Sequence, residues 1–315
     1  MTGAPPNIYD RRAYRARQKR AAACNGETIL ADLAISALAE RISIVNRRFE
    51  NALDLGLRGT GFEDLSALAE EWTHAALTVP LQNAQKFKGQ NFTAKNFTAK
   101  NFIVADEEAL PFAEHSFDLI VSMLSLHAVN DLPGALVQIR RALKPDGLFL
   151  AAMFGGDTLS ELRASFANAE TKIRGGISPR VAPFADIRDL GGLLQRAGFA
   201  LPVADVERTT LFYRDIGKLF LDLRSIGETN ALAARARSPL TRELLGAVVS
   251  EYAQRFADAD GRLPATFEII FLAGWAPQES QQKPLKPGSA KMRLADALGT
   301  QELPTGELPT GEKPQ

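Results

Sequence analysis

Hydrophobic residues form two continuous runs in the middle of the chain, with an amphipathic segment between them. The runs at 117–123 and 148–154 are apolar on both faces, which is typical of strands inside a parallel sheet that is covered by helices. Across 132–143 the apolar residues recur at helical spacing, and Lys144-Pro145-Asp146-Gly147 predicts the end of that helix in a tight turn. The pattern predicts a strand, a helix and a second strand, followed by Gly155-Gly156, where we expect the backbone to pass close to another group.

The region before these elements predicts the other half of the same sheet. Apolar runs at 52–55, 74–79 and 102–105 predict three more strands, and a glycine-rich turn, Gly56-Leu57-Arg58-Gly59-Thr60-Gly61, links the first of them to a helix. Such a turn lets the backbone approach a ligand, and ligands bind outside the carboxyl ends of the strands in an open parallel sheet. We therefore predict one doubly wound, Rossmann-like α/β domain over residues 50–276.

The two ends of the chain differ from this domain. Residues 1–49 predict a basic N-terminal helical arm, because the segment 11–20 holds six basic residues and no acidic one, and 29–45 has helical spacing. The basic face is either simply solvated or docks an acidic protein partner or a cofactor phosphate. Residues 277–315 are rich in Gln, Lys, Pro and Gly, and we expect this tail to be disordered.

Composition adds several exclusions. The 315 residues balance 37 basic against 37 acidic side chains, so nothing suggests a nucleic-acid partner. No apolar run approaches the roughly 20 residues that cross a bilayer, and the start of the sequence lacks an apolar signal segment. The single cysteine, Cys24, cannot form an internal disulfide. We therefore expect a cytoplasmic protein without a transmembrane segment.

Polar residues near the predicted strand ends are candidates for chemistry. His127 is a candidate general base or substrate contact, and it is alternatively a structural histidine that caps the following turn. Asp157 and Glu161 have a spacing that places both acids on one helical face, where they would bind a cationic substrate or simply be solvated. His74, His115 and His127 show no metal-ligand spacing, so we predict no metal site.

Several motifs carry a resemblance to a known family. They are LDLG at 53–56, VADEEALPF at 104–112, FDLIVSMLSLHAVNDLPGAL at 117–136, LKPDGLFLAAMFGGDTLSELR at 143–163 and GETN at 227–230. Over about residues 7–276, the chain resembles the class I S-adenosylmethionine-dependent methyltransferases, and within them the methyltransferase-type assembly factor of respiratory complex I. The resemblance implies a seven-stranded sheet with an antiparallel last strand, for which 204–213 and 267–275 are the candidates.

The resemblance also implies a site for S-adenosylmethionine. Asp106 would accept a hydrogen bond from the adenine amino group, which suits a carboxylate because it presents no donor; a solvated loop acid is the alternative. The residues that the resemblance assigns to the cofactor are Asp54, Gly56, Gly59, Gly61, Asp106, Glu107 and Leu124.

Two departures from the family pattern predict loose binding of the cofactor. The glycine turn is one residue out of step with Gly-x-Gly-x-Gly, and no carboxylate follows the second predicted strand to hold the ribose hydroxyls. Gln82 or Asn83 would offer only neutral hydrogen bonds there, which are weaker than charge-assisted ones.

The family implies hydroxylation of an arginine on a complex I subunit. We expect that arginine to enter a pocket formed by His127, Gly155, Gly156 and Asp157. Two other functions stay open: a small-molecule or carrier-protein O-methyltransferase, and a non-catalytic assembly chaperone that kept the fold.

Overall fold

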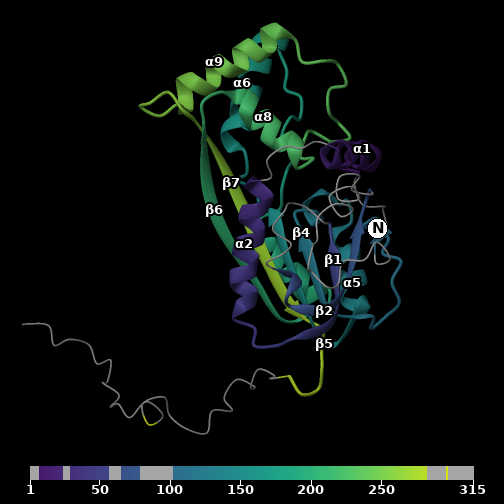
Figure 1. The fold of residues 1–315 in the computed structure, drawn as a ribbon. Helices are drawn as coiled ribbons and strands as arrows, with labels where there is room; N and C mark the ends of the chain where they lie inside the picture. Colours follow the sequence, from purple (N-terminus) through teal and green to yellow (C-terminus); the bar gives the residue numbers. More distant parts are fainter. Residues whose placement is uncertain (1–6, 24–28, 57–64, 79–101, 282–295, 297–315) are drawn as a thin grey trace, which may run out of the picture. The chain divides into compact units, whose positions relative to one another are not determined.

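The computed structural model describes residues 7–23, 29–56, 65–78, 102–281 and 296. Residues 1–278 form one compact unit, and residues 279–315 form a second. The strands and helices named below all belong to the first unit (Figure 1).

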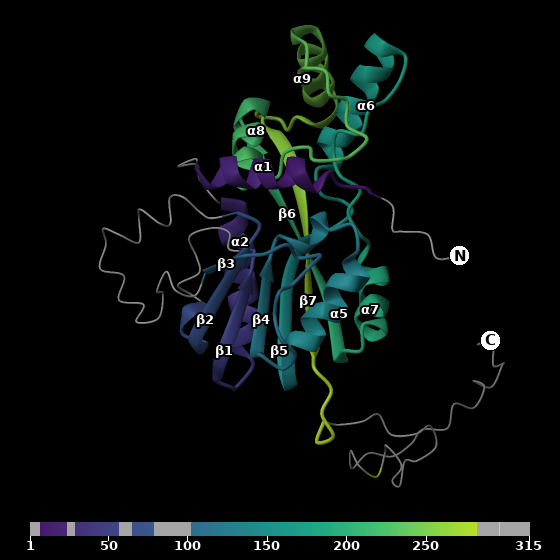
Figure 2. The same cartoon turned by 90° about the vertical axis from the view of Figure 1, so that its right-hand side faces the viewer.

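Seven strands form one sheet in the order β3-β2-β1-β4-β5-β7-β6. The strands are β1 (Phe49–Leu55), β2 (Ala69–Ala76), β3 (Phe102–Val104), β4 (Phe117–Met123), β5 (Leu143–Phe154), β6 (Ala200–Tyr213) and β7 (Leu263–Trp275). The first five run parallel to their neighbours, whereas β7 is antiparallel to both β5 and β6. Seven strands and an antiparallel partner for β5 confirm the implied fold, and of the two candidates it is 267–275 that lies in the antiparallel strand (Figure 2).

Helices cover both faces of this sheet. They are α1 (Arg11–Ala22), α2 (Ile29–Ser43), α5 (Leu132–Ala142), α6 (Ser160–Arg174), α7 (Ile187–Arg196), α8 (Ile216–Ser225) and α9 (Arg242–Phe256), together with the short 3-10 helix η2 (Leu126–Ala128). Buried side chains of α5 and α7 form one hydrophobic cluster with the sheet, and those of α2, α6, α8 and α9 form another. In Figure 2, α1 lies across the end of the sheet.

The centre of the sheet follows from two-sided hydrophobicity. Every residue of β4 is buried, and β4 pairs with β1 on one side and β5 on the other. Asp118 is the acidic exception, because its carboxylate oxygens accept the backbone N–H groups of Glu50 and Asn51, both at 2.9 Å. The prediction that these three strands are adjacent and parallel at the centre is confirmed.

Some predicted boundaries were wrong. The second strand covers Ala69–Ala76 instead of 74–79. It starts earlier than predicted, and Ala69 and Trp72 in its first half are already buried. After α5 the chain enters β5 at Leu143, so the predicted turn at 144–147 is part of that strand. Asp146, with φ of +60°, marks the irregularity where a turn was expected.

Within the part of the chain that the structure describes, no helix is both long enough and apolar enough to span a membrane. The predicted disorder of the tail concerns residues that lie almost entirely outside the described ones.

Truncation of α5 tests the packing of its buried face. Ile139 is fully buried, whereas Val137 on the same helix is 37% exposed. We expect Ile139→Ala to lower the free energy of unfolding by about 2–5 kcal/mol, because it leaves a cavity beneath the sheet. The matched change Val137→Ala should cost less than about 1 kcal/mol. Chemical denaturation of both variants measures the difference, and equal losses would contradict the assigned face.

Candidate functional site

The loops after β1, β3 and β4 meet at the carboxyl edge of the sheet. Ser125, in the loop after β4, donates from Oγ to the carbonyl oxygen of Leu55 at the end of β1, at 3.4 Å. From α1, Arg11 reaches both Asp106 after β3 and the carbonyl oxygen of Ala128 after β4. The segments that follow three separate strands are therefore brought together, as the parallel topology predicts.

Gly56 has a backbone conformation and a space that only glycine fits. Its φ is +123°, and a Cβ there would lie 3.0 Å from the carbonyl oxygen of Met123 and 3.1 Å from Cβ of Ser125. The end of β1 therefore packs directly on the loop after β4, and backbone forms the surface at this turn. Gly59 and Gly61, predicted for the same turn, lie outside the described residues.

Asp54 and His74 form a buried pair between β1 and β2. They are partners in the register of the two strands, and His74 Nδ1 lies 3.0 Å from Asp54 Oδ2. Their side chains are only 4% and 1% exposed, respectively. The neighbouring strand thus holds the carboxylate that was expected beneath the cofactor, and a role of Asp54 in cofactor binding stays a prediction.

Arg11 holds the acidic residues that follow β3. Its Nη2 lies 2.5 Å from Asp106 Oδ1 and 2.5 Å from Glu107 Oε2, and its Nη1 donates to the carbonyl oxygen of Ala128 at 2.9 Å. Arg15, one turn further along α1, lies 3.6 Å from Asp106 Oδ2. A solvated arm is therefore wrong for Arg11, because it binds acids of its own chain.

Burial and ion pairing shift the pKa values of this cluster in opposite directions. Burial raises the pKa of Glu107, although the charge of Arg11 acts in the other direction. Burial alone would lower the pKa of Arg11, but the carboxylates of Glu107 and Asp106 outweigh it and raise that pKa overall. Asp106 Oδ1 accepts from Arg11 and from the N–H of Glu108, whereas Oδ2 faces the more distant Arg15. The arrangement still leaves an acceptor that fits an exocyclic amine.

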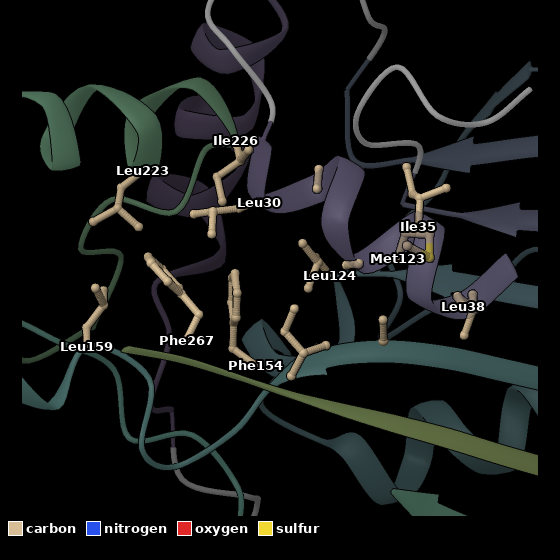
Figure 3. Packing of buried hydrophobic residues seen from close by; sticks show 14 of the residues in the cluster. Leu30, Ile35, Leu38, Met123, Leu124, Phe154, Leu159, Leu223, Ile226 and Phe267 are labelled. Carbon is tan, nitrogen blue, oxygen red and sulfur yellow. The ribbon is translucent and has the colours of Figure 1, made fainter. Parts of the chain in front are cut away.

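Leu124 belongs to the core. Its φ is +46°, its N–H donates to the carbonyl oxygen of Ala152 at 2.8 Å, and its side chain is fully buried (Figure 3). The positive φ turns the chain sharply after β4 and so directs the next residues toward α1. The predicted contact of Leu124 with a cofactor stays a prediction.

His127 is held by a carboxylate from a distant part of the chain. Its Nε2 lies 3.0 Å from Glu228 Oε2, and Tyr14 of α1 donates its hydroxyl to Glu228 Oε1, also at 3.0 Å. At the following turn Asp131 accepts the N–H of Gly134, and whether His127 has a catalytic or a structural role stays a prediction. A carboxylate can only accept, so Nε2 of His127 is the donor in its contact with Glu228.

An aromatic cavity of about 230 Å³ opens beside this network. Figure 3 shows two of its walls, Phe154 and Phe267, whose ring centroids are 6.2 Å apart. Glu228 and Tyr9 also line it. In the described part of the chain, neither the buried hydroxyl of Tyr9 nor Nδ1 of His127 has a hydrogen-bond partner. Tyr9 lines the cavity, whereas His127 does not. Buried polar atoms are rarely left unpaired, so the hydroxyl of Tyr9 marks a place for a polar ligand.

Asp157 and Glu161 lie elsewhere than expected. Asp157 precedes α6, is 57% exposed at its side chain and pairs with Arg208 of the edge strand β6. Glu161 accepts from the backbone N–H of Thr266 at 3.2 Å and is therefore held by β7. Neither acid lines the cavity, and Arg208 binds the carboxylate of Asp157. A role of Asp157 in catalysis stays a prediction.

The double glycine also packs against its own chain. A Cβ on Gly155 would lie 2.3 Å from Oε1 of Glu268, and Gly155 forms an isolated parallel bridge with Ala185. We expected another group to lie close to this backbone, and that group is Glu268 of the same chain. Among the described residues, no group of three or more His, Cys, Asp or Glu side chains could hold a metal ion.

Comparisons with known proteins agree with this geometry. A family model described as a methyltransferase domain matches residues 53–151. The arginine hydroxylase NDUFAF5 of Rattus norvegicus, whose name adds "mitochondrial", is 40% identical over 294 residues, which make up 92% of this chain and 83% of the relative. The chain belongs to the methyltransferase-fold family of the NDUFAF5 arginine hydroxylases.

Two further proteins are similar to this chain, one in sequence and one in fold. The malonyl-[acyl-carrier protein] O-methyltransferase of Gallionella capsiferriformans is 32% identical over 277 residues, which cover 86% of this chain and 92% of that enzyme. The solved structure of BH2331 from Bacillus halodurans has a TM-score of 0.53 at 17% identity, and the match covers 77% of this chain and 100% of that one. At such low identity the solved structure shows the fold alone.

Sequence reasoning missed four residues of the site: Tyr9, Arg11, Tyr14 and Glu228. Glu228 lies within the Gly-Glu-Thr-Asn motif at 227–230, which was noted only as a family match. Tyr14 follows Arg11 by three positions in the basic run, so the two share one face of a helix. An aromatic residue inside a run of arginines was the signal that could have identified this face.

Gly56→Ala tests the close contact at the end of β1. We expect a loss of stability of about 1–3 kcal/mol, because alanine is strained at φ of +123° and its Cβ meets the carbonyl oxygen of Met123. The control is Gly246→Ala, an exposed glycine in α9 with no neighbouring atom within 4 Å, which should be neutral or slightly stabilising. Thermal unfolding measures both, and equal behaviour would contradict the described packing of this turn.

Proposed function

We propose that this chain is an enzyme of the methyltransferase fold that acts in respiratory complex I assembly, where it modifies an arginine of a complex I subunit. The proposed modification is hydroxylation, in which a C–H bond of the arginine becomes C–OH. One oxygen atom of dioxygen is inserted, and the other leaves as water with two electrons and two protons from an external reductant. The observation that carries the proposal is the 40% identity to an arginine hydroxylase over 92% of this chain. The chemistry of the aromatic cavity supports it independently.

A cavity with aromatic walls and one carboxylate suits a guanidinium group. The faces of Phe154, Phe184 and Phe267 attract a cation, and Glu228 accepts its N–H groups. Tyr14 and His127 orient that carboxylate from two sides. We assign to Glu228 the binding of the arginine, to the aromatic walls the exclusion of water, and to Nδ1 of His127 the acceptance of a proton.

We propose that S-adenosylmethionine binds at the Gly56 turn and at Oδ2 of Asp106. When bound, this cofactor would supply an activated methyl group. Arg11 fixes Asp106 and Glu107 in place, since it pairs with both. Because Arg11 and Arg15 already attract this carboxylate, we expect the adenine contact to be weak.

The match to a malonyl-carrier-protein methyltransferase favours a second function, O-methylation of a carrier-bound acid. The cavity argues against it. Glu228 would repel a substrate carboxylate, and the guanidinium of Arg180, which also lines the cavity, is paired with the fully buried Glu170. A non-catalytic chaperone would keep the fold and lose cofactor binding.

The place of the protein in the cell is part of the proposal. The sequence leads us to propose the cytoplasm, whereas the names of the arginine-hydroxylase relatives include the word mitochondrial.

Calorimetric titration with S-adenosylmethionine tests the cofactor. We expect loose binding that Asp106→Ala weakens further, by about 1.5–3 kcal/mol, since a charged acceptor is lost. Asp131→Ala is the control, because Asp131 is a loop acid that caps α5. Tight binding that Asp106→Ala leaves unchanged would show that the cofactor does not bind at Asp106. No binding at saturating ligand would favour the chaperone.

Deletion of the gene tests the proposed function. Mass spectrometry of the complex I subunits should then show one arginine that lacks an oxygen atom, and complex assembly should be impaired. Wild-type protein should restore both, whereas Glu228→Gln should restore little, because the carboxylate that binds the guanidinium becomes neutral. The exposed Glu114→Gln serves as the matched control. Normal assembly with unchanged arginine masses would remove this function.

A further inference from the structure

Two grooves share lining residues with the aromatic cavity. The first, of about 760 Å³, lies between α1 and α8, and the second, of about 610 Å³, lies beside residues 229–237. Phe220 and Thr229 line both the cavity and the first groove. Arg180, Thr229 and Asn230 line both the cavity and the second groove. The cavity therefore adjoins both grooves, which share Arg17 and Thr229 with each other, and we call these the basic grooves.

Positive charge is in excess along them. Their charged lining consists of seven basic and two acidic residues: Arg17, Arg20, Arg180, Lys218, Arg224, Arg235, Arg237, Asp10 and Asp215. Both acids already have structural roles. Asp10 caps α1 and pairs with Arg235, and Asp215 caps α8. Arg180, Arg235 and Lys218 also have acidic partners, so the unbalanced positive charge lies on the other four basic residues.

Four of these cations lack an acidic partner. In the described structure Arg17, Arg20, Arg224 and Arg237 form no salt bridge, and all but the half-buried Arg17 are exposed. Arg17 instead donates to the backbone carbonyl oxygen of Asn230, at the mouth of the cavity. Its pKa is lowered, first by burial and then by the like charges of Arg235 and Arg20. An anion in the grooves would relieve this repulsion.

We infer that the basic grooves bind an extended segment of substrate protein that carries carboxylates close to the arginine entering the cavity. This inference rests on the proposed function, because it takes the cavity as the arginine site. Charge complementarity identifies the occupant. The unpaired arginines of the grooves require negative charge, and the proposed function requires a guanidinium beside Glu228, which His127 and Tyr14 hold in place. A polyanion such as nucleic acid meets only the first requirement, since its phosphates would face Glu228.

Fluorescence anisotropy with labelled peptides on the full chain tests this pattern. One peptide has a central arginine with aspartates and glutamates on both sides. A second replaces those acids by asparagine and glutamine, and a third keeps the acids but replaces the arginine by glutamine. We expect the first peptide to bind at least about tenfold more tightly than either of the others at low salt, with the difference shrinking as salt is added.

Charge-reversal variants locate the binding. Arg224→Glu and Arg237→Glu should each weaken the acid-flanked peptide about tenfold, because each puts a like charge in one groove. Arg48→Glu is the matched control and should have no effect, because the exposed Arg48 precedes β1 at the opposite end of the strand from the site. Circular dichroism of all three variants checks that they are folded.

Each outcome decides the inference. Equal binding of acidic and neutral flanks, or equal effects of Arg48→Glu and the groove variants, would overturn it. Binding of duplex DNA or of anionic vesicles in place of the peptides would also overturn it, in favour of those partners. Mass spectrometry of the bound peptide keeps the two claims separate. Groove-dependent binding of a peptide that gains no oxygen atom, with dioxygen and a reductant supplied, would support the docking surface and count against the hydroxylase function.

Discussion

The contact on which the rest of the site depends is the ion pair of Arg11 with Asp106 and Glu107. Glu107 is buried, and a buried carboxylate is tolerated only with a charged partner. Removing one partner of such a pair leaves an uncompensated charge and costs about 3–5 kcal/mol. The acids after β3 therefore determine where α1 lies, and α1 in turn covers the carboxyl edge of the sheet.

One face of α1 then serves three regions. Arg11, Tyr14 and Arg17 follow one another at intervals of three residues, so their side chains share a face. Arg11 contacts the acids that follow β3, Tyr14 contacts Glu228 in the aromatic cavity, and Arg17 contacts the backbone at Asn230 beside the grooves. If the proposed cofactor and the proposed substrate both alter the position of α1, linkage requires reciprocal effects on their binding.

The sheet could be predicted from the sequence because its signals are local. The two-sided hydrophobicity of 117–123 reports burial on both faces, whatever the remote partners are, and the strand found there has the same bounds. The close approach at Gly56 was predicted for the same reason, because a glycine directly after a strand indicates a backbone conformation that other residues rarely adopt. Boundaries failed where local signals conflicted: Pro145 and Gly147 predicted a turn inside what is a bulged strand.

The site could not be predicted to the same degree, because its deciding contacts join distant parts of the chain. Arg11 and Asp106 are 95 positions apart, and His127 and Glu228 are 101 apart, so neither pair leaves a periodic pattern. For Asp157 a local signal was misleading. Helical spacing predicted that Asp157 and Glu161 share a face, but Asp157 precedes α6 and pairs with Arg208 of the edge strand. Proteins that act on carrier-bound acids have related sequences over the same length. In the proposed function, the cover over the sheet would adapt this chain to a cationic substrate, because α1 and the 227–230 motif place one carboxylate among aromatic walls.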